Sequence, residues 1–328
     1  MMRILPLISF AGCFSPEPSS GPESVLAAAW EEMDHTYGNF ELRDVDWDAA
    51  WDTWSPIVGP DTTDDDLWEA LTGMLAPTDD GHVQLIAPGR DLWFANTVYR
   101  EGIGEDRFDL AVIRDGYLSA VAEEEGALWG TLADGTPYVH FAFVASNARA
   151  MQDVLDAHPD ARDLVVDLRH NAGGDFTWAF QAWDVLTDEA RPVFRSRTRN
   201  GPDRDAFTDW ETWSFEPGGD HRAVRVVLLT DRRTISAGER AALALQALPD
   251  TVTLGERTNG SFATMIGREL PNRWGLALPV QEVREPFGEA SWEGVGAPVD
   301  EWIENDPDDV AAGVDAVLDR ALGIVSSR

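Results

Sequence analysis

Residues 224–248, VRVVLLTDRRTISAGERAALALQAL, decide the fold of this chain. The apolar run at 224–229 predicts a buried strand, and the alanine- and leucine-rich segment that begins at Ala237 predicts a helix. A short polar turn connects the two. The stretch therefore predicts a strand, a turn and a helix in immediate succession, with Ser236 at the point where the turn becomes the helix.

Two roles are open to the Ser236 hydroxyl. The first backbone N–H groups of a helix have no partner within the helix and lie at its positive end. A serine at this position commonly caps the helix, and Glu239, three residues later, would complete a capping box. The same position also suits a nucleophile. The stretch by itself favours neither role.

The composition excludes several kinds of chemistry. The 328-residue chain has a formal net charge of −34, which argues against nucleic acid binding because few cations remain to neutralise phosphates. We interpret the acidic charge as a solvated surface, with a preference for basic substrates as the second interpretation. All 25 basic residues are arginine. A lysine general base and a lysine Schiff base are therefore excluded.

The N-terminus has the composition of an export signal. A short basic start at 1–3 precedes an apolar run at 4–11, and Cys13, the only cysteine of the chain, follows shortly afterwards. This pattern resembles a bacterial lipoprotein signal, although Phe10 stands where leucine is commonest. An ordinary secretory signal and a segment without a targeting role are the alternatives. We expect residues 1–24 to be a signal and linker, and the protein to lie on the periplasmic side of the cell envelope, anchored through a lipid on Cys13.

The rest of the chain is predicted to form two domains. Helical spacing of apolar residues predicts a small N-terminal helical domain over residues 25–88. In residues 89–328 strands alternate with helices, which predicts an α/β domain. The polar segment 188–222 favours a loop or lid, and the segment 308–322 predicts one closing amphipathic helix.

Two further segments contain candidate functional residues. A buried strand at 163–169 runs into Gly173 and Gly174, which lack side chains and so bring backbone N–H groups to the surface. A turn before a short apolar strand presents His82, which by position alone is more often structural than catalytic. No Walker motif, GxGxxG motif or metal-ligand spacing is present, so we expect no cofactor and no metal ion.

Several separated motifs resemble the tail-specific, or C-terminal-processing, serine peptidases. The motifs are VDLRHNAGG at 166–174, TISAGE at 234–239, GERTNG at 255–260 and EGVGAP at 293–298. The N-terminal part adds VDWDA at 45–49 and a DGH turn at 80–82. Each motif alone is modest evidence, but their common order is specific, and the resemblance extends over roughly residues 25–322.

The resemblance implies a crotonase/ClpP-like ββα core and peptide-bond hydrolysis. In this family the serine of the T-x-S-A motif is the nucleophile, which carries the role to Ser236. One branch uses a lysine after the G-E-x-T-x-G motif, but Ser261 occupies that position here. The branch that is similar to the tricorn core uses a histidine of the D-x-H turn and a glutamate near the last motif, which are His82 and Glu293 in this chain. No PDZ domain fits within residues 89–136.

This set of residues matches the needs of acyl transfer. A serine needs a base to remove its proton, and the base needs a carboxylate that orients it and stabilises its charged form. The oxyanion needs preorganised N–H donors, each worth about 100- to 1000-fold in rate. We expect these donors from Gly173, Gly174 and Ala237. The remaining candidates for the base and the carboxylate are His170, Glu256 and Glu239.

The sequence therefore predicts a secreted serine peptidase that binds a peptide or protein substrate and forms an acyl-enzyme. Two alternatives remain. One is a binding protein on the same fold without catalytic activity, and the other is an esterase that uses the same three residues.

Overall fold

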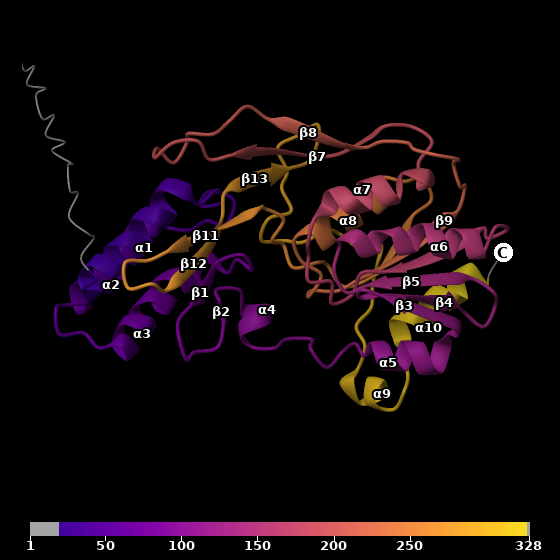
Figure 1. Ribbon diagram of the computed structural model, residues 1–328, viewed down its shortest axis with the longest axis horizontal. Helices are drawn as coiled ribbons and strands as arrows, with labels where there is room; N and C mark the ends of the chain where they lie inside the picture. Colours follow the sequence, from indigo (N-terminus) through magenta and orange to yellow (C-terminus); the bar gives the residue numbers. More distant parts are fainter. Residues whose placement is uncertain (1–19, 327–328) are drawn as a thin grey trace, which may run out of the picture.

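The computed structural model describes residues 20–326, so the predictions for the signal segment and Cys13 lie outside the described residues. The described chain forms two lobes and a separate three-stranded sheet that extends along both of them (Figure 1). No helix within the described range has the length and apolar content to cross a membrane.

The first lobe combines N-terminal helices with strands from two distant parts of the chain. Its sheet has the order β11-β12-β1-β2, in which all pairs are antiparallel. Its elements are α1 (Pro22–Thr36), α2 (Trp47–Trp54), α3 (Asp64–Leu75), β1 (Gln84–Ile86), β2 (Trp93–Phe94), β11 (Met265–Glu269) and β12 (Gly275–Pro279). Leu270, Trp274 and Leu276 belong to the same apolar cluster as the helices. The domain boundary at residue 88 stays a prediction.

The second lobe is built around a seven-stranded sheet of order β14-β10-β9-β6-β5-β4-β3. The five strands from β5 to β14 are parallel, and β4 and β3 continue the sheet antiparallel. Its strands are β3 (Ser119–Glu124), β4 (Ala127–Thr131), β5 (Pro137–Phe141), β6 (Asp163–Asp167), β9 (Arg225–Thr230), β10 (Val252–Gly255) and β14 (Glu301–Trp302). This mixed arrangement confirms the predicted α/β class.

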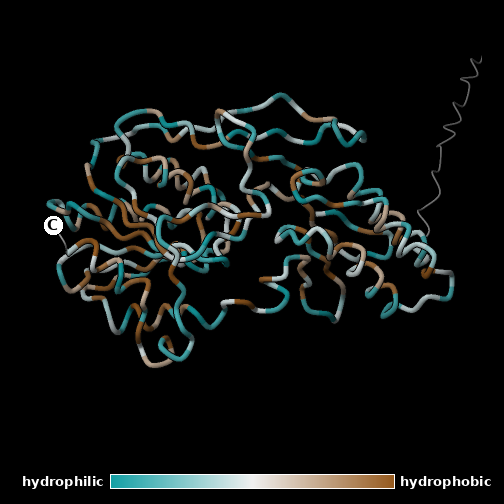
Figure 2. The backbone as a smooth tube through the Cα atoms, turned by 180° about the vertical axis from the view of Figure 1, so that it is seen from behind, coloured by the Kyte–Doolittle hydropathy of each residue, from teal (hydrophilic) through white to brown (hydrophobic). Residues whose placement is uncertain are grey.

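Helices cover both faces of this sheet. One face packs against α6 (Ala150–Ala157), α7 (Phe176–Ala182) and α8 (Ala237–Gln246), and the other against α10 (Ala316–Val325). Strand side chains alternate between the two layers: Val226 and Leu228 face α8, while Val227 faces α10. Apolar segments accordingly gather in the strands of the large sheet, and polar segments in the outer loops (Figure 2).

The third sheet corrects the prediction of a loop at 188–222, while a role of this segment as a lid stays a prediction. Within it lies the antiparallel pair β7 (Arg191–Thr198) and β8 (Glu211–Phe215), which β13 (Gln281–Arg284) extends. The pair is held by aromatic packing, since Trp213 stacks on Phe194 at a centroid distance of 6.2 Å. The polar composition reflects the outer face of a hairpin.

The predicted closing helix at 308–322 is also corrected, because the structure contains two helices there. The segment α9 (Pro307–Ala311) ends before Gly313, whose φ of +87° interrupts the helical path. The Asp315 side chain then caps α10 by accepting a hydrogen bond from Leu318 N at 2.8 Å. The remaining α-helices of the described chain are the short α4 (Thr97–Arg100) and α5 (Leu110–Val112).

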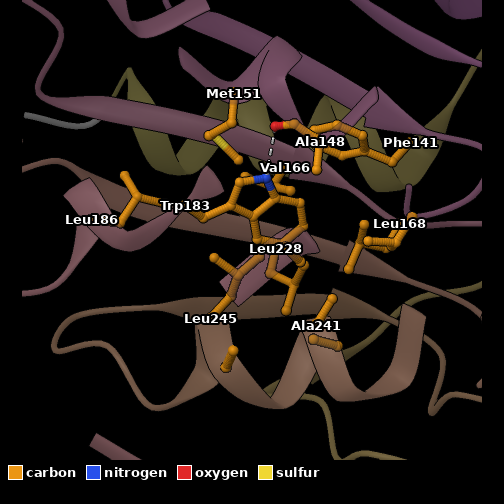
Figure 3. Close-up of a cluster of buried hydrophobic side chains, with 14 of the residues drawn as sticks. Phe141, Ala148, Met151, Val166, Leu168, Trp183, Leu186, Leu228, Ala241 and Leu245 are labelled. Atoms are coloured by element: carbon orange, nitrogen blue, oxygen red, sulfur yellow. Dashed lines mark hydrogen bonds between the residues drawn. The ribbon is translucent and has the colours of Figure 1, made fainter. Parts of the chain in front are cut away.

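Trp183 is the largest side chain between the large sheet and its helices (Figure 3). It is fully buried, and its indole N–H donates to the Ala148 carbonyl at 3.3 Å. It packs in the apolar cluster that supports α8, the helix that begins after Ser236.

Replacing Trp183 by alanine is expected to lower the free energy of unfolding by about 3–5 kcal/mol, because the change removes apolar contacts and leaves a cavity. Trp178→Ala is the matched control, since Trp178 lies on α7, which ends directly before Trp183, and is 42% exposed. Its cost should stay below about 1 kcal/mol. Urea unfolding followed by circular dichroism measures both, and equal losses would contradict the assignment of Trp183 to the supporting core.

Candidate active site

Ser236 occupies a strained turn between β9 and α8. Its backbone has φ 62° and ψ −124°, a region that residues other than glycine rarely adopt. Such a conformation costs about 1–3 kcal/mol and persists only where surrounding contacts fix it. Sharp strand-to-helix turns of this kind expose the nucleophile in α/β-hydrolases.

Ser236 and Glu239 form a capping box at the start of α8, as their spacing predicts. The Glu239 carboxylate accepts a hydrogen bond from Ser236 N at 3.0 Å, and the Ser236 side chain faces the backbone N–H of Glu239. The two roles of the Ser236 hydroxyl are not exclusive, because a serine at the start of a helix can cap it and still act as a nucleophile.

Glu239 fixes the backbone around Ser236. It is completely buried, and its two oxygens also accept hydrogen bonds from Gly260 N at 2.7 Å, Ser261 N at 2.9 Å and the Thr258 hydroxyl at 2.6 Å. Burial raises the pKa of Glu239 to about 7, and the four hydrogen bonds act in the opposite direction. This carboxylate joins the GERTNG loop to the serine turn.

The Gly173–Gly174 turn lies directly against Ser236. A Cβ on Gly173 would be 2.7 Å from Ser236 Cβ and 3.1 Å from its hydroxyl oxygen, and a Cβ on Gly174 would be 2.0 Å from the Val144 carbonyl oxygen. Both residues have positive φ, so only glycine fits here. The absent side chains let the backbone approach the serine.

The predicted oxyanion donors differ in their availability. Gly173 N already donates to the Asn171 side chain at 2.9 Å. Gly174 N and Ala237 N donate no hydrogen bond within residues 20–326. The geometry therefore suits a donor pair formed by Gly174 and Ala237, with Asn171 and Gly173 stabilising the turn.

His82 is buried on the turn between the short helical segment Ala76–Thr78 and β1. Its backbone N donates to Asp80 Oδ1 at 2.9 Å, which fixes the turn, while its ring Nδ1 has no hydrogen-bond partner among the described residues. Burial lowers the pKa of His82 to about 4, and the nearby Asp80 carboxylate raises it in part. The imidazole is therefore neutral near pH 7, as a general base requires.

Glu293 is buried and already bonded through both oxygens. Its Oε1 accepts from Phe262 N at 3.1 Å and from Ala263 N at 2.8 Å, and its Oε2 faces Arg43 Nη2 at 3.3 Å. Burial raises the pKa of Glu293, and the adjacent Arg43 lowers it. No hydrogen bond joins Glu293 or Ser236 to the His82 ring within the described chain.

Arg43 and Ser261 connect the segments that contain these residues. The buried Arg43 guanidinium contacts Asp80 Oδ2 at 3.1 Å and the Asp79 carbonyl at 2.8 Å, besides Glu293 and the Gly260 carbonyl. The Ser261 hydroxyl accepts from Gly81 N at 2.9 Å, beside His82. Neither role was predicted, because a single sequence contains no signal for partners about 200 residues apart.

The remaining candidates are engaged elsewhere. His170 Nδ1 pairs with Asp231 at 2.6 Å, and its ring packs on Phe108. Glu256 pairs with Arg232. No group of three or more His, Cys, Asp or Glu residues suited to a metal ion occurs within the range that the structure describes.

The chain belongs to peptidase family S41, whose family model matches residues 136–301. The model of the tricorn protease C1 domain matches residues 21–76. These matches confirm the family predicted from the motifs, and they make the chain a peptidase.

Solved structures share the fold. A candidate peptidase from Parabacteroides merdae ATCC 43184 superposes with a TM-score of 0.82 at 23% identity, covering 93% of this chain and 97% of that chain. Mature CPAF complexed with lactacystin gives 0.71 at 11% identity, with 93% and 98% covered. The photosystem II D1 C-terminal processing protease gives 0.53 at 18% identity, with 91% and 99% covered. At these identities the likeness establishes the fold alone.

The low pKa of His82 predicts an unusual pH profile. A base must be neutral to accept a proton, so activity should be lost only as the pH falls through about 4, instead of through the ordinary value of 6.5. The profile of kcat/KM against pH measures this, with circular dichroism at each pH as the control for folding. An acid limb near 6.5 would contradict the burial argument, whereas one near 7 would indicate titration of Glu239 and one near 8 titration of Glu293.

Proposed function

We propose that this S41 peptidase cleaves peptide bonds through an acyl-enzyme, with Ser236 as the nucleophile and His82 as the general base. One observation carries the proposal: Ser236 is held in a strained turn beside two backbone N–H groups that donate no hydrogen bond within residues 20–326. A structural serine would have no need of the strain.

The proposed reaction uses these groups in sequence. His82 takes the proton of the Ser236 hydroxyl as its oxygen attacks the peptide carbonyl carbon. The N–H groups of Gly174 and Ala237 bind the oxyanion. His82 then donates the proton to the departing amine, and a water molecule releases the acyl group by the same steps. Because catalytic hydrogen bonds tighten when substrate binds, the absence of a bond from His82 to Ser236 in the free protein is compatible with this role.

We assign Glu293 a less direct part than the usual orienting carboxylate. Its oxygens hold Phe262 N and Ala263 N, which border the cavity beside Ser236, and they contact Arg43. Asp80 contributes the carboxylate charge that most favours the protonated form of His82. Of the two buried carboxyl groups, Asp80 is thus the one that acts on His82 directly.

An extended peptide can reach the serine along β11. Among the described residues this strand pairs only with β12 and leaves its other edge free, and Met265 at its start lines the cavity that contains Ser236. Peptides commonly add as a further strand to such an edge. A peptide substrate is therefore favoured over a small ester.

A fluorophosphonate probe tests the nucleophile, since it reacts with activated serines. We expect labelling of the purified protein, complete loss in Ser236→Ala and at least about 100-fold slower labelling in His82→Ala. His170→Ala is the matched control and should keep the wild-type rate. Labelling that survives in Ser236→Ala would refute the assignment, and a folded wild-type protein that takes no label would favour the binding-protein alternative.

The same probe tests the predicted location. As part of this proposal the protein is exported and attached to the membrane through Cys13, on the basis of the N-terminal composition alone. The labelled protein is then expected in the membrane fraction of expressing cells, and in the soluble fraction for Cys13→Ser. Equal distribution of the two proteins would contradict the anchor.

A further inference from the structure

An arginine lines the cavity beside the proposed nucleophile. The cavity has a volume of about 380 Å³, and Ser236, Gly174 and Ala237 form one side of it. Phe176, Phe262 and Met265 give it an apolar wall. Two charged residues, Arg240 and Asp175, also line it. A substrate side chain next to the scissile bond would enter this space.

The Arg240 side chain is fixed, and one of its nitrogens has no partner. Arg240 is only 3% exposed; its Nε donates to the Phe262 carbonyl at 2.8 Å and its Nη2 to Gln281 Oε1 at 2.8 Å. Nη1 makes no hydrogen bond within residues 20–326. It is also not fully enclosed by protein atoms, so a ligand can reach it. A rigid guanidinium thus offers Nη1 to a ligand in the cavity.

The charge of Arg240 also has no ion-pair partner within the described chain. Glu239 and Glu293 act on it only from a distance, because their oxygens are bonded to other donors. The faces of Phe176 and Phe194 lie 4.7 and 5.0 Å from its guanidinium carbon. Burial lowers the pKa of Arg240 to about 10, but it remains charged at neutral pH. A buried cation of this kind is costly unless an anion pairs with it.

We propose that Arg240 binds a carboxylate of the substrate in this cavity, so that cleavage is selective for acidic groups next to the scissile bond. The inference rests on the proposed role of Ser236. The carboxylate belongs either to a glutamate or aspartate side chain of the peptide or to its free C-terminus, and both offer the planar group that a guanidinium binds best.

The acidic charge of the chain does not prevent this selectivity. Most of the net charge of −34 lies on solvent-exposed groups, whose effect is screened over about 10 Å. Asp175 is the carboxylate in the cavity that disfavours an acidic substrate group. Its Oδ1, however, accepts hydrogen bonds from Thr177 N at 3.0 Å and from the Thr177 hydroxyl at 2.7 Å as the cap of α7. Asp175 is therefore expected to weaken the preference without abolishing it.

Two pairs of probes test the inference. The first pair consists of peptidyl diphenyl phosphonates, which react with an active serine and differ in having a glutamate or a glutamine side chain beside the phosphorus. The second pair consists of peptides with a free or an amidated C-terminus. These peptides compete with the fluorophosphonate for the site, and the slowing of the labelling measures how well each one binds. In at least one pair, the wild-type protein should prefer the acidic member about 10- to 100-fold, in labelling rate for the first pair or in binding for the second. The pair that shows the preference identifies the source of the carboxylate.

Variants separate Arg240 from general effects on reactivity. In Arg240→Gln the ratio of the acidic to the neutral member of the pair should fall to about one. Because an overall loss of reactivity affects both members equally, it does not change this ratio. Asp175→Asn, which can still cap α7, should raise the ratio. Arg320→Gln makes the same change in net charge at an exposed position on α10 and should keep the wild-type ratio.

The outcomes are distinguishable. Labelling without an acidic preference in either pair, or a preference that survives in Arg240→Gln, overturns this inference and leaves the serine assignment intact. A wild-type protein that reacts with none of the probes overturns the proposed function, and this inference with it. If Arg240→Gln does not fold, the wild-type ratio for the glutamate probe must still disappear as the pH falls below its carboxyl pKa of about 4.3.

Discussion

The buried guanidinium of Arg43 is the contact on which the arrangement of the site depends. It belongs to the first lobe, and it reaches the turn that presents His82, the loop after GERTNG and the Glu293 carboxylate. These segments are separated by up to 250 residues in the chain. Without Arg43, Asp80 and Glu293 would be buried anions with no counterion, a situation that typically costs about 3–5 kcal/mol. The position of the histidine turn is thus set by the same cation that holds Glu293.

This cluster of buried groups has only a secondary influence on the protonation of the base. Two buried carboxyl groups, Asp80 and Glu293, surround one buried cation, and the His82 ring lies close enough to Asp80 and Arg43 to respond to both. Burial is the largest influence, and it keeps the imidazole uncharged. The nucleophile turn is supported separately, by the four hydrogen bonds that Glu239 accepts. The base and the nucleophile are therefore held in place by different contacts, and both sets of contacts include residues of the segment 260–263.

The sequence predicted the parts of the site that are local. The strand, turn and helix around Ser236, the glycine pair and the turn with His82 each follow from neighbouring residues, and the structure contains all of them. The order of the motifs also predicted the family. The strained φ of Ser236 could not be predicted, because it results from the contacts of Glu239 with a loop about 20 residues away.

Long-range partners account for what was missed. Arg43 lies in a segment whose composition suggests only a polar connection, and its partners come from two later motifs. The hairpin of β7 and β8 was mistaken for a loop because its arginines pack on aromatic rings, as Arg195 does on Trp210 at 4.3 Å. This packing produces a polar sequence in an ordered sheet. The catalytic roles of Ser236, His82 and Glu293 stay predictions.

The central claim is that the Ser236 hydroxyl forms a covalent intermediate during turnover, and the intact mass of the protein tests it most directly. A peptide that the protein cleaves, selected from a fluorogenic library, is mixed with it and the reaction is stopped with acid within milliseconds. The account predicts a mass increase equal to the acyl part of the substrate, located by digestion on the peptide that contains Ser236. Continued cleavage of the same peptide by a folded Ser236→Ala variant, with no adduct on either protein, would contradict it.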